Sequence, residues 1–500
     1  MTTALDKLAT QLRGELGSAA VITDPALLRT YECDGLTAYR AVPGVVLLPT
    51  DAYEVQACVR ACRDAGVPFV ARGSGTGLSG GALPVATGAL IVTAKLNRIL
   101  DIDPESQRAI VEPGVFNAAI SQAVAGHRLY YAPDPSSQQI CSIGGNVAEN
   151  SGGAHCLKYG FTVHHVTGIE ICTPDGELVT IGAGKAAEAP GYDLMGVFIG
   201  SEGTLGIATK VYVRLLRQPD AVVTMLAAYD DMESAGASVA AIIAAGLTPA
   251  AAEIMDALAI SAAEKAVDCR YPAGAGAVLV VEVDGPAAEV AAEHAAIDAI
   301  CRANNAFEVR TAVDATERAA LWRGRKSAFA AVGRISPDYV VQDGVVPRTA
   351  LATVLTQIEA LAAQHGVRVA NVFHAGDGNL HPLVLYDAAV DGALAAAEEV
   401  SGAILNLCID HGGSITGEHG VGVEKASFMA NMFTADDLDS MQLVRCAFDP
   451  DSRANPGKVF PTPRLCGEPR GGRAAEAALA SAIAAAKAAG ATVDDEPVVW

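Results

Sequence analysis

The sequence predicts an α+β protein built from two units, and three observations support this. Short apolar runs of strand length alternate with segments of helical periodicity along most of the chain. The 500 residues exceed what one ordinary hydrophobic core organises, so a division into domains is expected. The pattern breaks at Gln218 and Pro219, after which a new series of strands and helices begins.

The first unit opens with strands and one helix around a glycine-rich loop. Apolar runs of four or five residues predict the strands, and the spacing of apolar positions predicts the helix between the first two. These elements are expected at residues 45–48, 54–65, 68–71 and 89–93.

A second loop region divides the rest of this unit. Residues 133–160 are rich in Gly, Ser and Asn and are predicted as a long loop, a feature that is usually functional in a compact domain. A helix is expected before it, near residues 117–125. Short strands are expected after it, at residues 166–173, 178–181 and 210–216.

The second unit again mixes strands and helices. A comparable set recurs at residues 338–408, so the unit is interpreted as two split βαβ halves. Residues 467–500 differ, because a composition dominated by Ala favours helix but offers little to bury; they are predicted to be an appended surface tail. The elements expected in the first half are strands at 222–228 and 277–283 and helices at 232–245 and 287–303.

Composition and charge exclude several classes of function. With 51% apolar and 18% charged residues, the chain can bury a large interior and does not resemble a disordered protein. The formal net charge of −22, without a basic cluster, argues against a nucleic-acid partner. The same charge repels small anions, so a site for a carboxylate substrate must carry its own local positive charges.

Targeting signals and cysteines indicate the cytoplasm. Asp6, Lys7, Arg13 and Glu15 interrupt the apolar residues at the N-terminus, which is not the pattern of a secretory signal. No apolar run is long enough to span a bilayer, so membrane association is expected only peripherally, at the inner face and through a partner. The eleven cysteines form no CxxC pair, and reduced thiols are therefore expected.

The glycine-rich stretch at residues 72–81 follows a predicted strand. Its glycines would let successive backbone N–H groups converge on an anion such as a diphosphate. The stretch also matches GxGxxG, but Pro84 and Gly88 interrupt the helix that a dinucleotide fingerprint must open. A mobile cluster of turns is the simpler alternative.

Two further loops strengthen the case for a large cofactor. Residues 142–153 combine small residues with Asn146, Asn150 and Ser151, whose side chains can hydrogen-bond to a heterocycle or a ribityl chain. Residues 200–207 form a third glycine-rich loop in the same unit. Each loop alone is compatible with a purely structural role, but together they favour a long, extended cofactor.

These loops carry a resemblance to a known family. Residues 72–80, 133–135, 143–146 and 200–206 resemble the FAD-binding domain of the vanillyl-alcohol-oxidase type, and the second half resembles the C-terminal domain of FAD-linked oxidases. The most similar family is the flavin subunit of glycolate oxidase, beside D-lactate and D-2-hydroxyglutarate dehydrogenases. The resemblance covers roughly residues 41–461.

The resemblance implies a domain organisation. It predicts an FAD-binding domain at residues 1–218, an inserted antiparallel-sheet substrate domain at 219–418, a return to the FAD domain at 419–466, and the tail at 467–500. Some members attach the flavin through a histidine in the first loop, whereas this chain has Ser74 and Thr76, so noncovalent FAD is implied. The residues assigned to FAD are Arg72, Gly73, Ser74, Gly75, Thr76, Gly77, Ser79, Gly80, Pro133, Asp134, Ser142, Gly145, Asn146, Asn150, Ser151, Gly152, Glu202, Gly203, Gly206, Ile207 and Asn455.

A candidate metal set lies in the second half. His374 and His381 flank a tight Asp-Gly-Asn turn, and Glu418 and His419 add a carboxylate and a third imidazole. Two His and one carboxylate are a common ligand set for a divalent metal, although a histidine in such a turn can simply cap it. The resemblance implies that His374, His381 and Glu418 bind a divalent metal, with zinc expected, and that His419 is the catalytic base. A fourth ligand or an outer hydrogen-bond donor is the alternative role for His419.

The expected substrate is a small 2-hydroxycarboxylate. Arg325 matches the family's carboxylate-binding arginine, with a domain-interface salt bridge as its alternative role. Hydroxyglutarate dehydrogenases carry a lysine where this chain has Gln342, and an asparagine where it has Leu383. A second substrate carboxylate would lack those partners. A short D-2-hydroxy acid such as glycolate or D-lactate is therefore favoured over D-2-hydroxyglutarate.

The predicted reaction is hydride transfer from the substrate α-carbon to FAD, with electrons passed to a non-nicotinamide acceptor. Related glycolate oxidases work with a second flavin-type subunit and an iron–sulfur subunit, and such partners are expected because this sequence has no cluster motif. Two rivals are a metal-dependent hydrolase, with the glycine loops as scaffold, and a noncatalytic subunit that keeps the fold.

Overall fold

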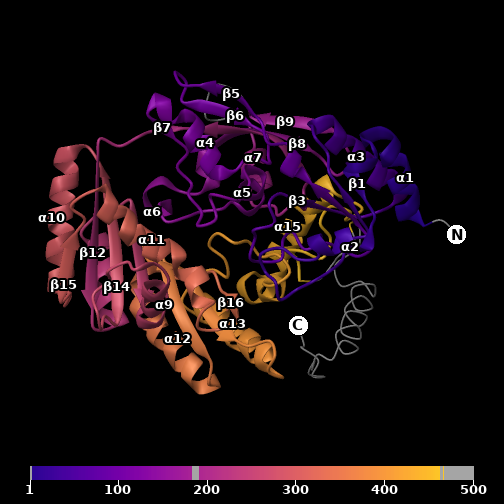
Figure 1. The fold of residues 1–500 in the computed structure, drawn as a ribbon. Helices are drawn as coiled ribbons and strands as arrows, with labels where there is room; N and C mark the ends of the chain where they lie inside the picture. Colours follow the sequence, from indigo (N-terminus) through magenta and orange to yellow (C-terminus); the bar gives the residue numbers. More distant parts are fainter. Residues whose placement is uncertain (1–2, 183–190, 462–465, 467–500) are drawn as a thin grey trace.

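The computed structural model describes residues 3–182, 191–461 and 466 of the chain, and the predicted tail at 467–500 lies outside these residues. Two parts lie side by side in Figure 1, the first in violet tones and the second in pink and orange. Both mix helices and sheets, and this confirms the predicted α+β class.

The first unit contains two sheets that meet around its glycine loops. In the four-stranded sheet, β2 (Val45–Leu47) and β3 (Phe69–Arg72) both run parallel to β4 (Ala89–Val92), with β1 (Val21–Ile22) at the edge. Helix α3 (Ala52–Ala65) makes the crossover from β2 to β3. The second sheet is antiparallel, in the order β5 (Ile99–Asp103), β6 (Arg108–Val111), β10 (Ile207–Arg214), β8 (Val166–Cys172), β9 (Leu178–Gly182).

The residues of helix α3 account for its start, its end and its buried face. The Asp51 side chain caps its start by accepting the Glu54 N–H, and Gly66 ends it in the left-handed conformation at φ 64°. Its apolar positions recur at helical spacing, so Val55, Cys58, Val59 and Cys62 are all buried against the sheet.

The prediction of a long loop at residues 133–160 was wrong in part. The structure has helix α5 (Ile143–Glu149) and the single-turn helix α6 (Cys156–Tyr159) within it. Ser142 is the N-cap of α5 and accepts the Gly145 N–H at 3.3 Å, while Asn150 ends the helix at φ 53°. Paired glycines disfavour helix on their own, and here tertiary packing against Pro113 overrides that preference.

The second unit is an antiparallel sheet covered by helices on both faces. Along β12, Met225, Ala227 and Tyr229 enter one core, whereas Leu226 and Ala228 enter the other, as the two-residue period of a strand requires. The main order is β15 (Glu308–Thr311), β12 (Ala221–Tyr229), β14 (Ala277–Gly285), β13 (Ala251–Asp256), β18 (Arg368–His374), β19 (Asn379–Leu380), β17 (Gly344–Val345), with β20 (Pro382–Tyr386) between β18 and β16 (Asp338–Val341).

The helices divide between these two faces. Buried residues of one core come from α8 (Met232–Ala244), α10 (Ala287–Ala303), α12 (Leu351–His365) and α13 (Ala393–Asp410). The other core takes residues of α9 (Ala257–Val267) and α11 (Ala315–Val332). The sequence did not predict β13 and α9, because all six residues of β13 are buried and show no alternation.

The chain returns to the first unit after α13. Phe69 of β3 donates its N–H to Arg453 O at 2.9 Å and accepts the Asn455 N–H at 2.8 Å. Helix α15 (Ala435–Phe448) precedes this contact and lies behind the first unit in Figure 1. Residues far apart in sequence therefore complete one edge of the four-stranded sheet.

The structure bears on two further features of the chain, the state of its cysteines and the character of its helices. The expectation of reduced thiols was wrong for one pair, because Cys446 and Cys466 form a disulfide with Cα atoms 5.5 Å apart. These two cysteines are twenty residues apart, and no sequence motif indicates that they pair. Within the described ranges, no helix has both the length and the apolar character needed to cross a bilayer.

His165 makes the stability of the first unit sensitive to acid. Burial lowers its pKa to about 4, so the folded protein holds this imidazole neutral while the unfolded chain takes up a proton nearer pH 6.5. Acidification from about pH 7 to about pH 5 should then cost about 2 kcal/mol of unfolding free energy through this residue. His165→Gln, which keeps a donor for Tyr159 O, should remove that part of the slope in urea denaturation across this pH range.

His127→Gln is the matched control, because His127 is exposed and its replacement should leave the slope of wild type. If His165→Gln and wild type lose stability in parallel on acidification, the buried neutral imidazole is not the cause.

Candidate active site

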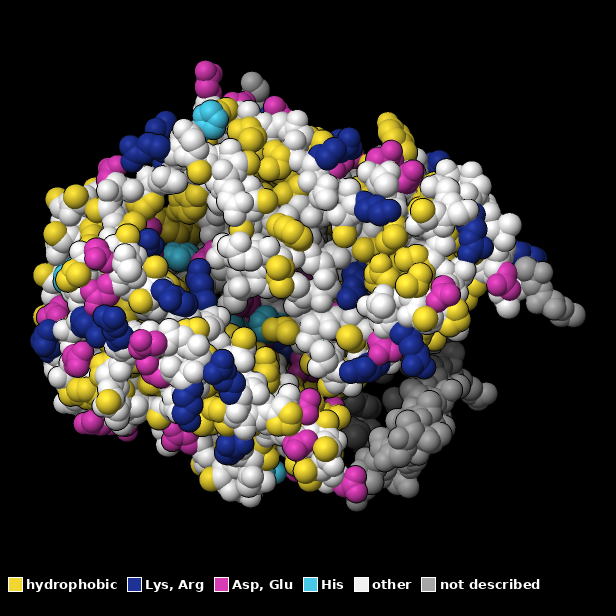
Figure 2. Space-filling view, viewed as in Figure 1, with side chains coloured by type: hydrophobic (Ala, Val, Ile, Leu, Met, Phe, Trp, Pro, Cys, Tyr) yellow, Lys and Arg dark blue, Asp and Glu magenta, His cyan; other side chains and the backbone are white. Residues whose placement is uncertain are grey.

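A cavity of about 680 Å³ lies between the two units. Its long wall comes from the glycine loops of the first unit, and its far end is formed by residues of the second unit, including Lys326, Phe329 and His381. In Figure 2, imidazoles drawn in cyan are visible deep in the hollow where the two parts meet. The glycine loops and the histidines therefore open into one space.

Most residues assigned to FAD from the sequence line this cavity. The loops contribute much bare backbone, because many lining positions are glycine. The lining members of the set are Arg72, Gly73, Ser74, Gly75, Thr76, Gly77, Ser142, Gly145, Asn146, Ser151, Glu202, Gly203, Gly206 and Ile207.

The other assigned residues do not line the cavity and make structural contacts nearby. Asp134 pairs with His155, Nδ1 to Oδ2, at 2.9 Å, and Asn150 accepts the Val163 N–H. Asn455 Nδ2 donates to Gly81 O at 2.8 Å and to Glu202 O at 2.6 Å, so it ties the returning chain to two loops. The remaining members outside the lining are Ser79, Gly80, Pro133 and Gly152.

The first glycine loop fits an extended cofactor. Gly75 has φ 69°, which favours glycine, and a Cβ at Gly73 would collide with Ser142 Oγ. Arg72 lines the cavity, and its Nη1 donates to Cys33 O at 2.7 Å. Asn146 lines the cavity, and its Nδ2 is buried without a hydrogen-bond partner in the described structure. The loop would therefore let a cofactor come close to its backbone, and Asn146 Nδ2 is available to donate a hydrogen bond to it.

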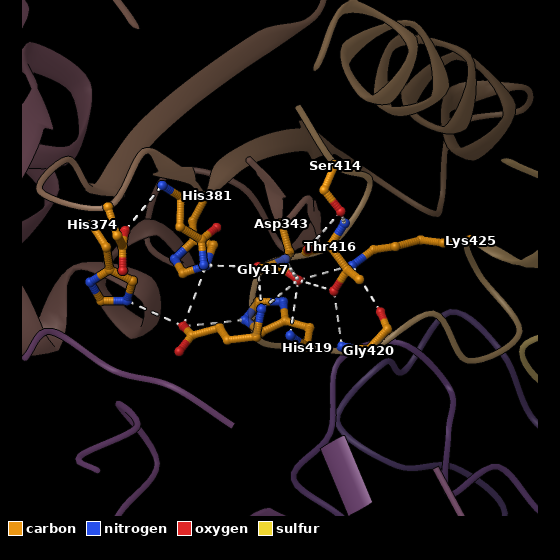
Figure 3. Close-up of polar contacts among 12 residues, drawn as sticks. Asp343, His374, His381, Ser414, Thr416, Gly417, His419, Gly420 and Lys425 are labelled. Carbon is orange, nitrogen blue, oxygen red and sulfur yellow. Dashed lines mark hydrogen bonds and ion pairs between the residues drawn. The ribbon is translucent and has the colours of Figure 1, made fainter. Parts of the chain in front are cut away.

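Three of the predicted metal ligands converge. His374 Nε2 lies 3.2 Å and His381 Nε2 lies 3.5 Å from Glu418 Oε1. His374 ends β18, His381 follows β19, and Glu418 lies on the loop after α13, so strand ends and a loop bring them together (Figure 3). The donor atoms all lie within 4.8 Å of one another, which is compatible with one shared divalent cation.

Glu253 orients the first imidazole. Its Oε1 lies 2.8 Å from His374 Nδ1, which leaves Nε2 to face Glu418. A carboxylate behind a ligating histidine fixes the ring and its tautomer, as in known metal sites. Burial disfavours charge on His374, but Glu253 and Glu418 outweigh it and raise the pKa of His374 well above the ordinary value.

Arg325 lies behind the cavity rather than in its lining. The side chain is 2% exposed, and its Nη2 is 2.6 Å from Glu253 Oε2 without the alignment of a hydrogen bond. The pair lies inside the second unit, so the structure does not have the domain-interface salt bridge considered for Arg325. Its Nε is also unpartnered, whereas the neighbouring Lys326 lines the cavity.

Asp343 anchors the loop that carries Glu418 and His419. It accepts the Gly417 N–H at 3.0 Å and the His419 N–H at 2.9 Å, and it also accepts the Thr416 hydroxyl (Figure 3). The fully buried Lys425 contacts it at 3.3 Å. Burial opposes the charge of Asp343, but His419 and Lys425 hold its pKa well below the usual range.

His419 stacks on His381 with ring centroids 4.8 Å apart. Its Nδ1 is buried without a hydrogen-bond partner in the described structure, and its Nε2 lies 3.9 Å from Glu418 Oε1. Burial lowers the pKa of His419 to about 4, so the ring is neutral at neutral pH and one nitrogen can accept a proton.

Sequence reasoning missed Glu253, Asp343 and Lys425 as parts of the site. Glu253 could have been found from the sequence. It is the one carboxylate within the apolar run Ala251 to Met255, and a buried carboxylate requires a charged or hydrogen-bonding partner. Asp343 lies between β16 and β17 (Gly344–Val345), and only the tertiary structure brings the donors of a distant loop to it.

Family models match the chain in two blocks: residues 43–182 match the FAD binding domain, and residues 218–459 match FAD linked oxidases, C-terminal domain. The chain is 53% identical over 438 residues to the glycolate oxidase subunit GlcD of Escherichia coli (strain K12), covering 88% of each. It is 31% identical over 467 residues to D-lactate dehydrogenase of Anaerostipes hadrus, covering 89% of this chain and 95% of that protein.

Among solved structures, p-cresol methylhydroxylase with substrate bound has a similar backbone. The TM-score is 0.77 at 17% identity, with 91% of this chain and 96% of that one covered. The predicted family resemblance and the predicted fold, a two-part flavin domain with an antiparallel-sheet domain inserted, are confirmed by these matches.

Replacing Asp343 should destabilise the protein strongly. Asp343→Asn keeps the size but removes the carboxylate that forms the ion pair of the buried Lys425, and breaking a buried pair in this way costs about 3–5 kcal/mol. Urea denaturation should register the loss. Asp377→Asn is the control: Asp377 is half-buried and accepts only the Asn379 N–H among the hydrogen bonds of the described residues, so its loss should be much smaller. Equal losses in the two variants would contradict a special role for Asp343.

Proposed function

Because the chain belongs to the FAD-linked oxidase family, we propose that it oxidises a short D-2-hydroxy acid, glycolate or D-lactate, to the 2-oxo acid. The observation that carries the proposal is the single cavity that joins the glycine loops to His381, Glu418 and His419. A substrate held at the histidines would face whatever group the loops bind. The relatives named glycolate oxidase subunit and D-lactate dehydrogenase support the same substrate class.

FAD is the cofactor that the loops would hold. The flavin supplies a two-electron acceptor for hydride from the substrate α-carbon. Gly73, Gly75 and Gly77 would let the flavin lie against the loop backbone. Asn146 would donate a hydrogen bond from Nδ2, which has no partner in the described structure. Ser74 and Thr76 occupy the positions at which a histidine attaches the flavin in some relatives, so noncovalent binding is proposed.

His374, His381 and Glu418 would hold a divalent cation, and zinc is proposed. Such a cation supplies positive charge that lowers the pKa of the substrate hydroxyl and fixes its orientation. The carboxylate of Glu253 behind His374 supports this assignment, because it leaves one ring nitrogen free to face the cavity side.

His419 is proposed as the base. Its Nδ1 has no hydrogen-bond partner in the described structure, and the neutral ring can receive the hydroxyl proton as the α-carbon loses hydride. Stacking on His381 keeps the two rings parallel and restricts the orientation of His419.

The substrate carboxylate requires a cation, because the chain as a whole repels anions. Arg325 is proposed for this role because it matches the family's carboxylate-binding arginine. Its Nε has no hydrogen-bond partner in the described structure, while its Nη2 forms an ion pair with Glu253 behind the cavity lining. Lys326 lines the cavity and would add positive potential along the approach.

The surroundings of the site favour a monocarboxylate. Gln342 is committed to a hydrogen bond with Glu424 at 2.7 Å, and Leu383 is fully buried in the sheet. Neither residue offers a charge to a second carboxylate, so D-2-hydroxyglutarate is the less favoured substrate.

The electrons are proposed to leave through partner subunits. The relative from Escherichia coli is named a subunit of glycolate oxidase, and this sequence has no iron–sulfur motif. A second flavin-type subunit and an iron–sulfur subunit are the proposed acceptors. Peripheral attachment to the inner face of the membrane would then come from those partners.

Flavin reduction tests the proposed reaction. Purified protein should be yellow, and anaerobic glycolate or D-lactate should bleach it. His381→Ala should abolish bleaching but keep bound FAD, because His381 is proposed to bind metal and substrate rather than cofactor. Stopped-flow absorbance after mixing measures both rate and flavin content.

His411→Ala is the matched control, since His411 lies at the C-terminal end of α13 and its imidazole contacts only Gln357 among the hydrogen bonds of the described structure. This variant should bleach like wild type. An oxidised spectrum that persists with every short hydroxy acid would refute the proposed reaction, and bleaching by His381→Ala at the wild-type rate would refute the metal role.

Arg325 and Lys326 can be separated by steady-state kinetics. Arg325→Lys keeps the charge but loses the guanidinium fork, so KM for glycolate should rise about 10- to 100-fold, as expected for a lost charged hydrogen bond. Lys326→Gln should change KM only a few-fold, and mainly at low ionic strength. A larger effect from Lys326→Gln than from Arg325→Lys would transfer the carboxylate-binding role to Lys326.

A further inference from the structure

The loop that carries Glu418 and His419 is held at both ends by buried carboxylates from different units. Asp343 of the second unit binds the first part of the loop, through the amides of Gly417 to His419. Glu202 of the first unit binds the next part: the Val421 N–H donates to Oε1 at 2.7 Å, and the Gly422 N–H donates to Oε2 at 2.6 Å. The two anchors bind consecutive parts of the loop: Asp343 holds the amides of residues 417–419, and Glu202 holds those of residues 421–422.

Glu202 is itself rigidly placed. Its N–H donates to Ala148 O at 2.8 Å, and its carbonyl accepts Asn455 Nδ2 at 2.6 Å. Its backbone has φ 51°, a conformation that a non-glycine residue keeps only when the surroundings hold it there. Its carboxylate is 5% exposed, and both the residue and its neighbour Gly203 line the cavity.

The loop approaches the first unit too closely for side chains. Gly420 has φ 83° and Gly422 has φ 55°, and both favour glycine. A Cβ at Gly420 would collide with Glu149 Oε2, and a Cβ at Gly422 would collide with Ser79 O. The Val423 N–H also donates to Ser79 O at 3.0 Å. The contact between loop and first unit is thus made by backbone against a carboxylate and a carbonyl.

We propose that Glu202 is a positioning residue whose two amide contacts hold Glu418 and His419 at the end of the flavin cavity. The proposal rests on the proposed function, in that it takes His374, His381 and Glu418 as a metal site. Without the Glu202 anchor the loop gains freedom that must be given up when the metal binds, so metal binding weakens although Glu202 is not a ligand.

Zinc affinity of the FAD-loaded protein tests this. Glu202→Gln replaces one acceptor oxygen by an NH₂ group that faces a loop N–H, and competition with a chromophoric chelator should show about 10- to 100-fold weaker zinc binding. Glu149→Gln is the matched control, because Glu149 is also buried in the cavity wall beside Gly420 but makes no hydrogen bond to the loop within the described residues. Its zinc affinity should stay within about twofold of wild type.

Hydrogen exchange supplies a readout that needs no metal. Amides in the peptide containing residues 416–422 should exchange faster in Glu202→Gln than in wild type, and at the wild-type rate in Glu149→Gln. Glu202→Asp keeps the charge on a shorter side chain and should show intermediate exchange and intermediate zinc affinity. If Glu202→Gln does not fold, Glu202→Asp is the variant to compare with wild type and with Glu149→Gln.

The outcomes separate this inference from the proposed function. Absence of zinc binding by wild type would refute the metal part of the proposed function, and loop exchange would then decide the role of Glu202. Wild-type loop exchange in Glu202→Gln, or equal losses of zinc affinity in Glu202→Gln and Glu149→Gln, would overturn the positioning role.

Discussion

The buried carboxylate of Asp343 is the constraint on which the candidate active site depends. A fully buried anion is costly unless charge and hydrogen bonds compensate it, and here the compensation comes from Lys425 and from successive amides of one loop. Those amides can reach Asp343 only if the loop folds back over the end of β16. The same fold-back presents Glu418 to His374 and His381, so satisfying one buried charge also brings the three candidate metal ligands together.

The rest of the architecture serves this arrangement. The sheet of the second unit is buried on both faces, and its strand ends hold His374 and Glu253 in fixed register, with Glu253 opposite His374 in the β13–β18 pair. The first unit supplies bare backbone around the cavity, because glycines line so much of it. A polar end therefore faces a cavity whose glycine loops expose backbone, which suits a small substrate beside a large planar cofactor.

The sequence predicted those elements whose own residues determine them. Helix α3 was predicted from the spacing of its apolar residues, although two residues too short at its start, and α10 (Ala287–Ala303) was predicted with the bounds that the structure has. Helix α5 was missed because Gly144 and Gly145 disfavour helix locally, and β13 because a strand buried on both faces has no alternation. The sequence identified His374, His381 and Glu418 as candidate metal ligands, and the structure brings them together. The roles of Glu253 and Asp343 depend on contacts between segments far apart in the chain, and the Cys446–Cys466 pair has no motif in the sequence.

The return of the chain to β3 has a consequence for biosynthesis. The hydrogen bonds of Phe69 with Arg453 and Asn455 cannot form until nearly the whole polypeptide has left the ribosome. Until then, the emerging first half carries an incomplete sheet edge and lacks the Asn455 amide that ties Gly81 to Glu202. The groove proposed to hold the prosthetic group therefore gains its last contacts only after residues 453–455 are synthesised, and a gene cut at the apparent boundary near Pro219 would encode a fragment that lacks them.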